Sequence, residues 1–375
     1  MNLNDKKILI VGSGLYGAVW CDILTSNYNC DVTIIDKRDH IGGNIYTYKE
    51  NNIDIHKYGP HIFHTNEKRI WEYITKFDDF LPYIQETLAK DKYGNLYHLP
   101  FNMNTFYDIY KAITPSQAKE YIQNDIVKYD NPKNLEEQAL STVGIAIYEI
   151  LIKNYTEKQW GKKCTELSPD VIKRLPLRFE FNNNYFNDKY QGIPKHGYSY
   201  IIEQMICNAK NIILNEDFNN DREEYINNYN LIIYTGAIDE LLDYVFGQLE
   251  WRSLKFENVL IDKNDTQGCS IINDVSINNA YTRTIEHCYF TGKQNENDHI
   301  LRTYEYPNKW DVNSEKYYPI NNDFNNELYN KYLTLLNEKY PTIMIGGRLG
   351  KYKYFDMDDT ILEAFNDINK LLCLN

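Results

Sequence analysis

Three glycines near the amino terminus, Gly12, Gly14 and Gly17, have the spacing of a phosphate-binding turn. In such a turn the first glycine permits the sharp bend, the second lets the backbone approach a pyrophosphate, and the third allows a helix to pack closely on a strand. Asp36 follows Gly17 at about the ~20-residue spacing expected of the acid that accepts from a ribose hydroxyl. Because a carboxylate repels a 2′-phosphate, the pattern favours FAD or NAD over NADP.

The elements that must position this turn are a strand before it and a helix after it. Residues 8–11 are an apolar run that predicts the strand, and an amphipathic helix is expected up to about Ser26. Residues 32–35 predict a second strand that ends at Asp36. The amino terminus of the helix supplies N–H groups and a partial positive charge for phosphates. The sequence therefore predicts a dinucleotide-binding βαβ unit.

A second pair of glycines, Gly42 and Gly43, precedes Asn44. This segment resembles the second glycine signature of flavoproteins with the same fold, and it favours FAD.

The remainder of the chain predicts an α/β protein with a Rossmann-like FAD-binding domain, an inserted helical domain and an antiparallel-sheet substrate region. The stretch from about 67 to 170 has helical periodicity, 179–302 has short β-branched and aromatic runs, and a strand at 342–345 precedes a helix from Asp358. The expected boundaries are 1–66, 190–245 and 340–375 for the FAD domain, 67–178 for the helical domain, and 179–189 with 246–339 for the sheet domain.

Composition limits the class of protein and its partners. The net charge of −13 argues against nucleic-acid binding, and 43% hydrophobic with 25% charged residues fits a globular protein. The seven cysteines are scattered and form no C-x-x-C pair, which indicates free thiols in a reducing compartment. No signal peptide or run of about 18–20 apolar residues is visible, so a cytoplasmic protein without membrane insertion is expected.

Nearly the whole chain resembles the UDP-galactopyranose mutase family. The segments that carry the resemblance are, in order, YGPHIFHT (58–65), YTEKQWG (155–161), KRLPLRF (173–179), NYF (184–186), YQGIP (190–194), YTR (281–283), YYP (317–319) and GRLGKYKYFDMD (347–358). The resemblance implies the interconversion of UDP-galactopyranose and UDP-galactofuranose, with no net redox change, through a covalent adduct between N5 of reduced FAD and the sugar. It also implies NADPH or NADH as the reductant and a possible homodimer.

The resemblance assigns roles to residues in these segments. Arg174 and Arg283 match the arginines that bind the diphosphate and stabilise it as it leaves. The expected substrate-binding residues are Gln85, Tyr155, Thr156, Trp160, Tyr185, Arg252, Asn273, Tyr318 and Tyr354. The expected cofactor-binding residues are Gly12, Gly14, Gly17, Asp36, Gly43, Asn44, His61, Ile62, Arg348, Phe355, Asp356, Met357, Asp358 and Thr360. A mobile lid is expected near 161–175.

Several alternatives stay open. Leu151 and Ile152 stand where many members have phenylalanines, and Gln85 is the nearest equivalent of an asparagine, so a 2-acetamido sugar in place of galactose, or beside it, is one alternative. A flavin amine-oxidase-like oxidoreductase, an NAD-dependent epimerase or dehydrogenase, and a non-catalytic nucleotide-sugar binding protein are the others. No metal is expected at His56, His61 and His64, because no Asp, Glu or Cys completes a familiar spacing.

Overall fold

The computed structural model describes residues 3–172, 177–294, 296, 298–311 and 314–373. The described chain divides into two compact units. Unit 1 comprises Met1–Pro82, Asp188–Arg252 and Val312–Asn375, and unit 2 comprises Tyr83–Asn187 and Ser253–Asp311. The three regions expected from the sequence have other boundaries, and that division stays a prediction.

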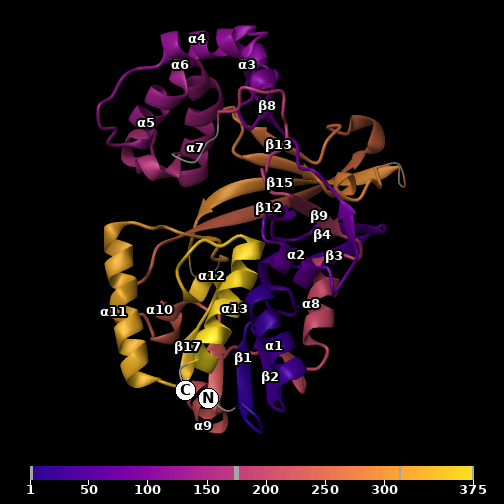
Figure 1. Ribbon diagram of the computed structural model, residues 1–375, viewed down its shortest axis with the longest axis vertical. Helices are drawn as coiled ribbons and strands as arrows, with labels where there is room; N and C mark the ends of the chain where they lie inside the picture. Colours follow the sequence, from indigo (N-terminus) through magenta and orange to yellow (C-terminus); the bar gives the residue numbers. More distant parts are fainter. Residues whose placement is uncertain (1–2, 173–176, 295, 297, 312–313, 374–375) are drawn as a thin grey trace. The chain divides into compact units, whose positions relative to one another are not determined.

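Unit 1 is built on a parallel sheet with the strand order β10-β2-β1-β11-β17. Figure 1 labels β1, β2 and β17 of this sheet. Its strands are β1 (Lys7–Val11), β2 (Asp31–Asp36), β10 (Asn211–Leu214), β11 (Leu231–Tyr234) and β17 (Ile343–Ile345). Ile8 of β1 is paired with Val32 on one side and with Leu231 on the other. Ile8 is fully buried, as expected where helices cover both faces of a parallel sheet. This confirms the predicted Rossmann-like α/β fold.

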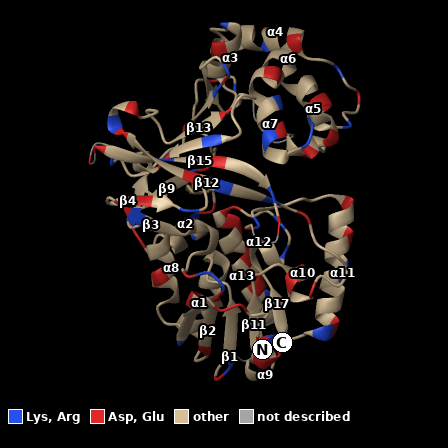
Figure 2. Cartoon of the chain, turned by 180° about the vertical axis from the view of Figure 1, so that it is seen from behind, with Lys and Arg blue, Asp and Glu red and all other residues tan. Residues whose placement is uncertain are grey.

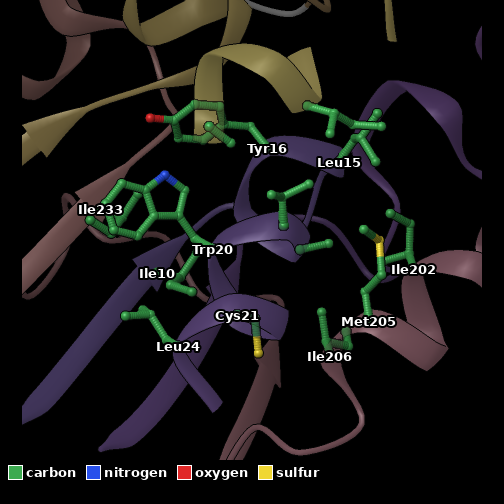
Figure 3. Packing of buried hydrophobic residues seen from close by; sticks show 14 of the residues in the cluster. Ile10, Leu15, Tyr16, Trp20, Cys21, Leu24, Ile202, Met205, Ile206 and Ile233 are labelled. Atoms are coloured by element: carbon green, nitrogen blue, oxygen red, sulfur yellow. The ribbon is translucent and has the colours of Figure 1, made fainter. Parts of the chain in front are cut away.

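Helices surround this sheet. They are α1 (Leu15–Asn27), α2 (Lys68–Ile74), α8 (Tyr198–Ile206), α9 (Arg222–Asn228), α10 (Ile238–Leu241), α11 (Asp323–Lys339), α12 (Gly347–Gly350) and α13 (Met357–Cys373). Figure 3 shows Trp20 of α1 beside Ile10 and Ile233 of the sheet, in the hydrophobic cluster of this unit. Residues 15–21 of α1 are all buried, so the expected amphipathic helix is covered on more than one side, by α8 and α13 as well as by the sheet.

Smaller sheets complete unit 1. β3 (Thr47–Glu50) pairs with β4 (Ile53–His56), and β9 (Tyr190–Pro194) lies between β5 (Phe63–Thr65) and β6 (Phe80–Pro82). β16 (Tyr318–Pro319) pairs with the first two residues of β12 (Trp251–Asp262). From Ser253 onward β12 belongs to unit 2.

Unit 2 contains a mixed sheet in which β12, β15, β14, β13, β7 and β8 follow one another. The strands beside β12 are β15 (His299–Lys309), β14 (Arg283–Glu286), β13 (Ile271–Asp274), β7 (Thr87–Lys90) and β8 (Leu96–Leu99). β13 pairs with β7 in parallel, whereas β14 pairs with β13 and β15 in antiparallel fashion. The described pairs among the strands of the expected sheet region are antiparallel, and β7, from the stretch expected to be helical, adds a parallel neighbour.

The helices of unit 2 bury a separate hydrophobic cluster. They are α3 (Met103–Tyr110), α4 (Pro115–Asp125), α5 (Leu135–Thr142), α6 (Gly144–Ile147) and α7 (Lys153–Trp160). A π-helical segment, Tyr148–Ile152, joins α6 to α7. Leu151 and Ile152 are buried in the cluster, so these two departures from the family pattern are core residues here.

Two stretches differ from the expected secondary structure. The hairpin β7–β8 lies inside the stretch expected to be helical, because Asp91 accepts from the backbone N–H groups of Tyr93 and Asn95 and stabilises a turn there. α8 lies inside the stretch expected to be β. Its tyrosines and isoleucines have weak helix propensity, but Ile201 and Ile202 are fully buried in the unit 1 cluster, and this packing determines the structure.

Candidate functional site

The glycine turn of unit 1 is too crowded for side chains. Gly12 has φ of 103°, and a Cβ placed on it would lie 2.0 Å from Oγ1 of Thr235. A Cβ on Gly17 would lie 2.2 Å from the carbonyl oxygen of Gly12, and one on Gly43 would lie 2.9 Å from Cα of Gly14. The two glycine signatures therefore meet, at the amino terminus of α1, where Gly14 is the N-cap and provides no capping side chain.

Asp36 holds this turn at the end of β2. Its Oδ2 accepts from the backbone N–H of Ser13 at 2.8 Å and from the Ser13 hydroxyl at 2.6 Å, and its Oδ1 accepts from the N–H of Arg38 at 2.9 Å. Asp36 is buried. This carboxylate fixes the shape of the glycine turn, and its predicted contact with a ribose stays a prediction.

Arg38 is a residue of this region that the sequence analysis did not single out. Its guanidinium lies 4.4 Å from the ring centre of Tyr58 and pairs with Glu315 at 2.6 Å. It also donates to the side-chain oxygen of Asn44 at 2.9 Å. Its position two residues after Asp36 was the signal available in the sequence. Arg38 thereby connects the end of β2 to the second glycine segment.

The segment with His61 lies beside Arg348 of the carboxyl-terminal strip. Burial, and then the positive charge of Arg348, lower the pKa of His61 to about 4, so its imidazole is neutral at pH 7. Arg348 donates to the carbonyl of Phe355 at 2.6 Å and lies 4.7 Å from the ring centre of Tyr354. Ile62 is buried next to His61. The structure thus brings these predicted cofactor residues into one part of unit 1.

The first turn of α13 is formed by the remaining predicted cofactor residues. Met357 is its first residue, and Asp358 follows. Thr360 donates through its N–H and its hydroxyl to the carbonyl of Asp356, at 2.9 and 2.8 Å. Burial raises the pKa of Asp358.

Tyr318 and Tyr354, two predicted substrate residues, also lie together in unit 1. Their ring centres are 5.9 Å apart, and the hydroxyl of Tyr354 donates to Asp356 at 2.9 Å. Arg252 is opposite Tyr318 in the β12–β16 pair. Arg252 is buried, and this burial lowers the pKa of its guanidinium.

In unit 2, Arg283 lies at the centre of a polar cluster. Its Nε donates to Asn273 at 3.2 Å, its Nη1 to Glu305 at 3.4 Å and its Nη2 to the Tyr155 hydroxyl at 3.4 Å. Asn273 and Glu305 are buried. Burial raises the pKa of Tyr155 to about 12, so its hydroxyl keeps a proton to donate while it accepts from Arg283. Three predicted site residues thus meet, together with Glu305, which sequence reasoning missed.

The strand pair that carries Arg283 contains a second arginine–glutamate pair for comparison. Arg283 is opposite Glu305, and Glu286 is opposite Arg302, in the register of β14 and β15. The pair of Arg302 with Glu286 measures 2.6 Å, against 3.4 Å for Arg283 with Glu305. Positions 283 and 286 of a strand point to opposite faces of the sheet. The same ladder therefore holds a close ion pair on one face and a longer one, at the predicted site, on the other.

α7 carries Tyr155, Thr156 and Trp160, which are all partly exposed. Lys158 of the same helix donates to the backbone of the loop that leads into β14, at 2.8 Å to the carbonyls of Asp274 and Tyr281. Sequence reasoning missed this role, although Lys158 lies within the YTEKQWG segment.

Gln85 and Tyr185 are neighbours in unit 2. The N–H of Tyr185 donates to the carbonyl of Gln85 at 2.7 Å, and the ring of Tyr185 is exposed. The amide of Gln85 is 1% exposed and donates to Thr87 at 3.0 Å while it accepts from Tyr83 at 2.9 Å. Its predicted role in binding substrate stays a prediction.

Arg174, predicted to bind the diphosphate, lies outside the described residues. Of the predicted lid at 161–175, the structure describes residues 161–172. This part contains the 3₁₀ turns Cys164–Glu166 and Pro169–Val171.

The histidines and cysteines have ordinary partners. Among the described residues, no group of three or more His, Cys, Asp or Glu side chains could hold a metal ion. Nδ1 of His56 accepts from the N–H of His61 at 3.0 Å, and His64 pairs with Asp188 at 2.7 Å. The cysteines whose side chains are described are free thiols.

None of the helices within the described ranges is long and apolar enough to cross a bilayer. Acidic and basic side chains are interspersed along the chain (Figure 2).

Comparison with known proteins identifies the family. A family model described as UDP-galactopyranose mutase matches residues 150–354, which is more than half of the chain, and an NAD(P)-binding Rossmann-like domain model matches residues 10–77. The chain is 38% identical to the probable UDP-galactopyranose mutase of Klebsiella pneumoniae, over 99% of this chain and 96% of the relative. The chain belongs to the UDP-galactopyranose mutase family. It is therefore an isomerase.

A second relative shows that substrates vary among similar chains. The chain is also 38% identical to a dTDP-fucopyranose mutase of Escherichia coli, with 96% of each chain covered. Among solved structures, a reduced UDP-galactopyranose mutase matches with a TM-score of 0.74 at 15% identity, covering 100% of this chain and 95% of that one. At this identity the structural match establishes the family fold alone.

Proposed function

We propose that this chain interconverts UDP-galactopyranose and UDP-galactofuranose with FAD as its cofactor. The observation that carries the proposal is the family match over 150–354, because that range contains Tyr155 and Arg283, whose side chains meet in one cluster. Asn273, Glu305 and Tyr155 all contact the guanidinium of Arg283, so residues from three separate elements orient this permanent charge within one cluster.

The residues of unit 1 fit the cofactor. A Cβ at Gly12 would clash with Thr235 and one at Gly43 would clash with Gly14, so this turn requires glycine. Gly14, the N-cap of α1, provides no capping side chain, and the helix amino terminus where a pyrophosphate would bind keeps its N–H groups available. Gly12, Gly14, Gly17, Gly43 and Asp36 would hold the dinucleotide there. Reduced FAD, when bound, supplies covalent nucleophilic catalysis from its N5 atom at the anomeric carbon, with no net redox change. NADPH or NADH is the proposed reductant.

The side chains of unit 2 manage the charge of the substrate. Ring contraction requires O5 to leave the anomeric carbon and O4 to replace it, so UDP must depart and return. Arg283 carries a permanent charge and planar N–H donors, which suit a diphosphate whose charge increases as it leaves. Tyr155 donates a hydrogen bond from its hydroxyl to a phosphate oxygen, or its ring stacks on the base. Asn273 and Glu305 hold the guanidinium in place.

A substrate panel tests this function. The FAD-loaded protein is reduced with dithionite under anaerobic conditions, and the products formed from UDP-galactofuranose, its 2-acetamido analogue and dTDP-fucofuranose are separated by chromatography. The proposal predicts the highest kcat/KM for UDP-galactofuranose. Oxygen consumption without a ring-contracted or ring-expanded product would instead indicate an oxidase.

A dTDP-fucopyranose mutase is the second candidate, because that relative is as similar to this chain as the UDP-galactopyranose mutase relative. Turnover of dTDP-fucofuranose with none of the UDP sugars would establish it. A homodimer is the assembly that the family resemblance implies, and size-exclusion chromatography with light scattering measures it.

A further inference from the structure

The ammonium group of Lys158 lies among oxygens of a single loop, the one that joins β13 to β14. Nζ is 2.8 Å from the carbonyl oxygens of Asp274 and Tyr281 and 3.2 Å from that of Asn279. The Asp274 carboxylate is also 3.2 Å away. The side chain of Lys158 is 13% exposed. A lysine that bonds both ends of a loop fixes the shape of that loop.

The loop is further closed by Asp274 itself. Its carboxylate accepts from the side chain of Asn279 at 2.8 Å and from the N–H of Ser276 at 3.0 Å. An ammonium group has three protons and no planar constraint, so it can satisfy carbonyls that converge from different directions. Loss of the ammonium leaves these oxygens and a buried carboxylate without their cation, which is costly.

Lys158 connects the two elements that carry the polar cluster. Tyr155 lies one turn before Lys158 on α7, so both face the same side of the helix. The loop that Lys158 holds leads through Thr282 to Arg283, the first residue of β14. Tyr155 and Arg283 meet through a contact of 3.4 Å. The position of one relative to the other therefore depends on how α7 is attached to this loop.

We propose that Lys158 is a positioning residue that sets the placement of Tyr155 against Arg283 and thereby the affinity of the site for the UDP moiety. The proposal rests on the proposed function, in which these two residues bind the nucleotide-sugar. It predicts that loss of the Lys158 contacts weakens nucleotide binding even where the fold is intact.

Lys158→Met tests the proposal, because it removes the charge and retains most of the stem. Lys153→Met is the matched control, since Lys153 lies on the same helix and pairs with Glu149 at the surface. The dissociation constant for UDP is measured by calorimetry on the FAD-loaded, reduced protein, at a temperature well below each unfolding midpoint. We expect UDP to bind about tenfold more weakly to Lys158→Met, a value within the range of couplings between contacting residues, and unchanged affinity in the control. An unchanged affinity in Lys158→Met overturns the proposal, even if its unfolding midpoint falls.

Lys158→Arg serves as a second variant in case the methionine variant does not fold. Arginine keeps the charge but its planar fork cannot reach the same converging carbonyls, so we expect a smaller loss of UDP affinity of about threefold. Combining Lys158→Arg with Tyr155→Phe gives a double-mutant cycle. If Lys158 acts through Tyr155, the double variant binds UDP about as weakly as the worse single variant; fold-changes that multiply contradict the proposal.

UDP binding by the wild-type protein distinguishes failure of the proposed function from failure of the positioning role of Lys158. A wild type that binds no UDP contradicts the proposed function, and this proposal with it. A wild type that binds UDP no better than Lys158→Met contradicts the positioning role alone.

Discussion

The two units of this chain prepare their predicted binding regions by different means. In unit 1 the glycine turn is shaped by backbone geometry: Gly12 has a positive φ, and Thr235 occupies the position that its Cβ would need. In unit 2 the cluster around Arg283 is made of side chains from separate elements, held by contacts of 3.2–3.4 Å. The turn of unit 1 depends on the lack of side chains at its glycines, and the cluster of unit 2 depends on the charge of Arg283.

This difference determines how each region should fail. Any side chain added to the glycine turn, even a methyl group, disrupts the backbone conformation and so the fold. Removal of a charged group from a side-chain cluster changes binding and turnover while the fold remains.

Gly12→Ala should have the largest effect. The new Cβ would lie 2.0 Å from Oγ1 of Thr235, which cannot move away easily because it donates to the carbonyl of Val11 at 2.7 Å. We expect a loss of more than about 3 kcal/mol of stability, above the usual cost of positive φ alone, and a protein purified without flavin absorbance.

Gly247→Ala is the control for Gly12→Ala. Gly247 has nearly the same φ, 100° against 103°, but nothing lies within 4 Å of its Cβ position. It should cost only about 1–3 kcal/mol and retain FAD. Equal flavin content in the two variants would show that crowding at the turn does not matter.

Arg283→Ala and Arg302→Ala should have opposite consequences. Arg283 is proposed to donate to the diphosphate, so its loss should lower turnover by about 10²–10³ while FAD is retained. Loss of Arg302 leaves the fully buried Glu286 without its 2.6 Å partner, so stability should fall by about 3 kcal/mol with little change in turnover per folded molecule. Turnover and thermal unfolding are measured on both variants, and a turnover loss shared equally by the two contradicts the assignment of Arg283.

Acid should destabilise both units. Burial lowers the pKa of His287 in unit 2 to about 3, and burial with Arg348 lowers that of His61 in unit 1 to about 4. At these two positions the unfolded chain takes up protons as the pH falls below about 6.5, whereas the folded chain does so only near pH 3–4, so the two histidines lower stability across this window. Differential scanning fluorimetry at pH 7.5, 6 and 4.5 measures the midpoint.

A variant of one histidine isolates its share of the acid effect. His287→Gln keeps a donor for Thr303, which lies 3.0 Å from Nε2, but it cannot titrate. The decline of its midpoint between pH 6.5 and 4 should be shallower than that of the wild type. An identical decline would mean that His287 contributes nothing.

Glu305→Gln should have the smallest effect, which is a small increase in the affinity for UDP. Glu305 is buried beside Arg283, and its charge would repel a diphosphate bound at the proposed site. Replacement by glutamine keeps an acceptor for the guanidinium and removes the negative charge, so UDP should bind about threefold more tightly. Titration of the reduced protein with UDP measures the change, and weaker binding would indicate that the charge of Glu305 is needed to hold Arg283.

The two regions also differ in what the sequence could predict. The turn, β1 and β2 follow from residues 8–36, because a strand, a glycine turn and a helix are local patterns. The turn of the β7–β8 hairpin has a local signal at Asp91, but the pairing of β7 with β13 has none, because β13 lies far along the chain. Tyr155, Asn273 and Arg283 were grouped only by family resemblance, since α7, β13 and β14 are brought together by nonlocal pairing.

Glu305 and Lys158 were not predicted at all. Glu305 becomes visible only when the register of β14 and β15 places it opposite Arg283. Lys158 lies three residues after Tyr155 and could have been noticed from that spacing alone, but its partners on the loop could not.

The most direct test of the account compares the reduced and the oxidised protein on one substrate. UDP-galactofuranose is incubated with FAD-loaded protein, either reduced with dithionite under anaerobic conditions or kept oxidised, and the sugar nucleotides are separated by chromatography. We predict that UDP-galactopyranose forms with the reduced protein and not with the oxidised protein. Absence of UDP-galactopyranose in the reduced sample, with FAD bound and UDP affinity intact, would contradict it.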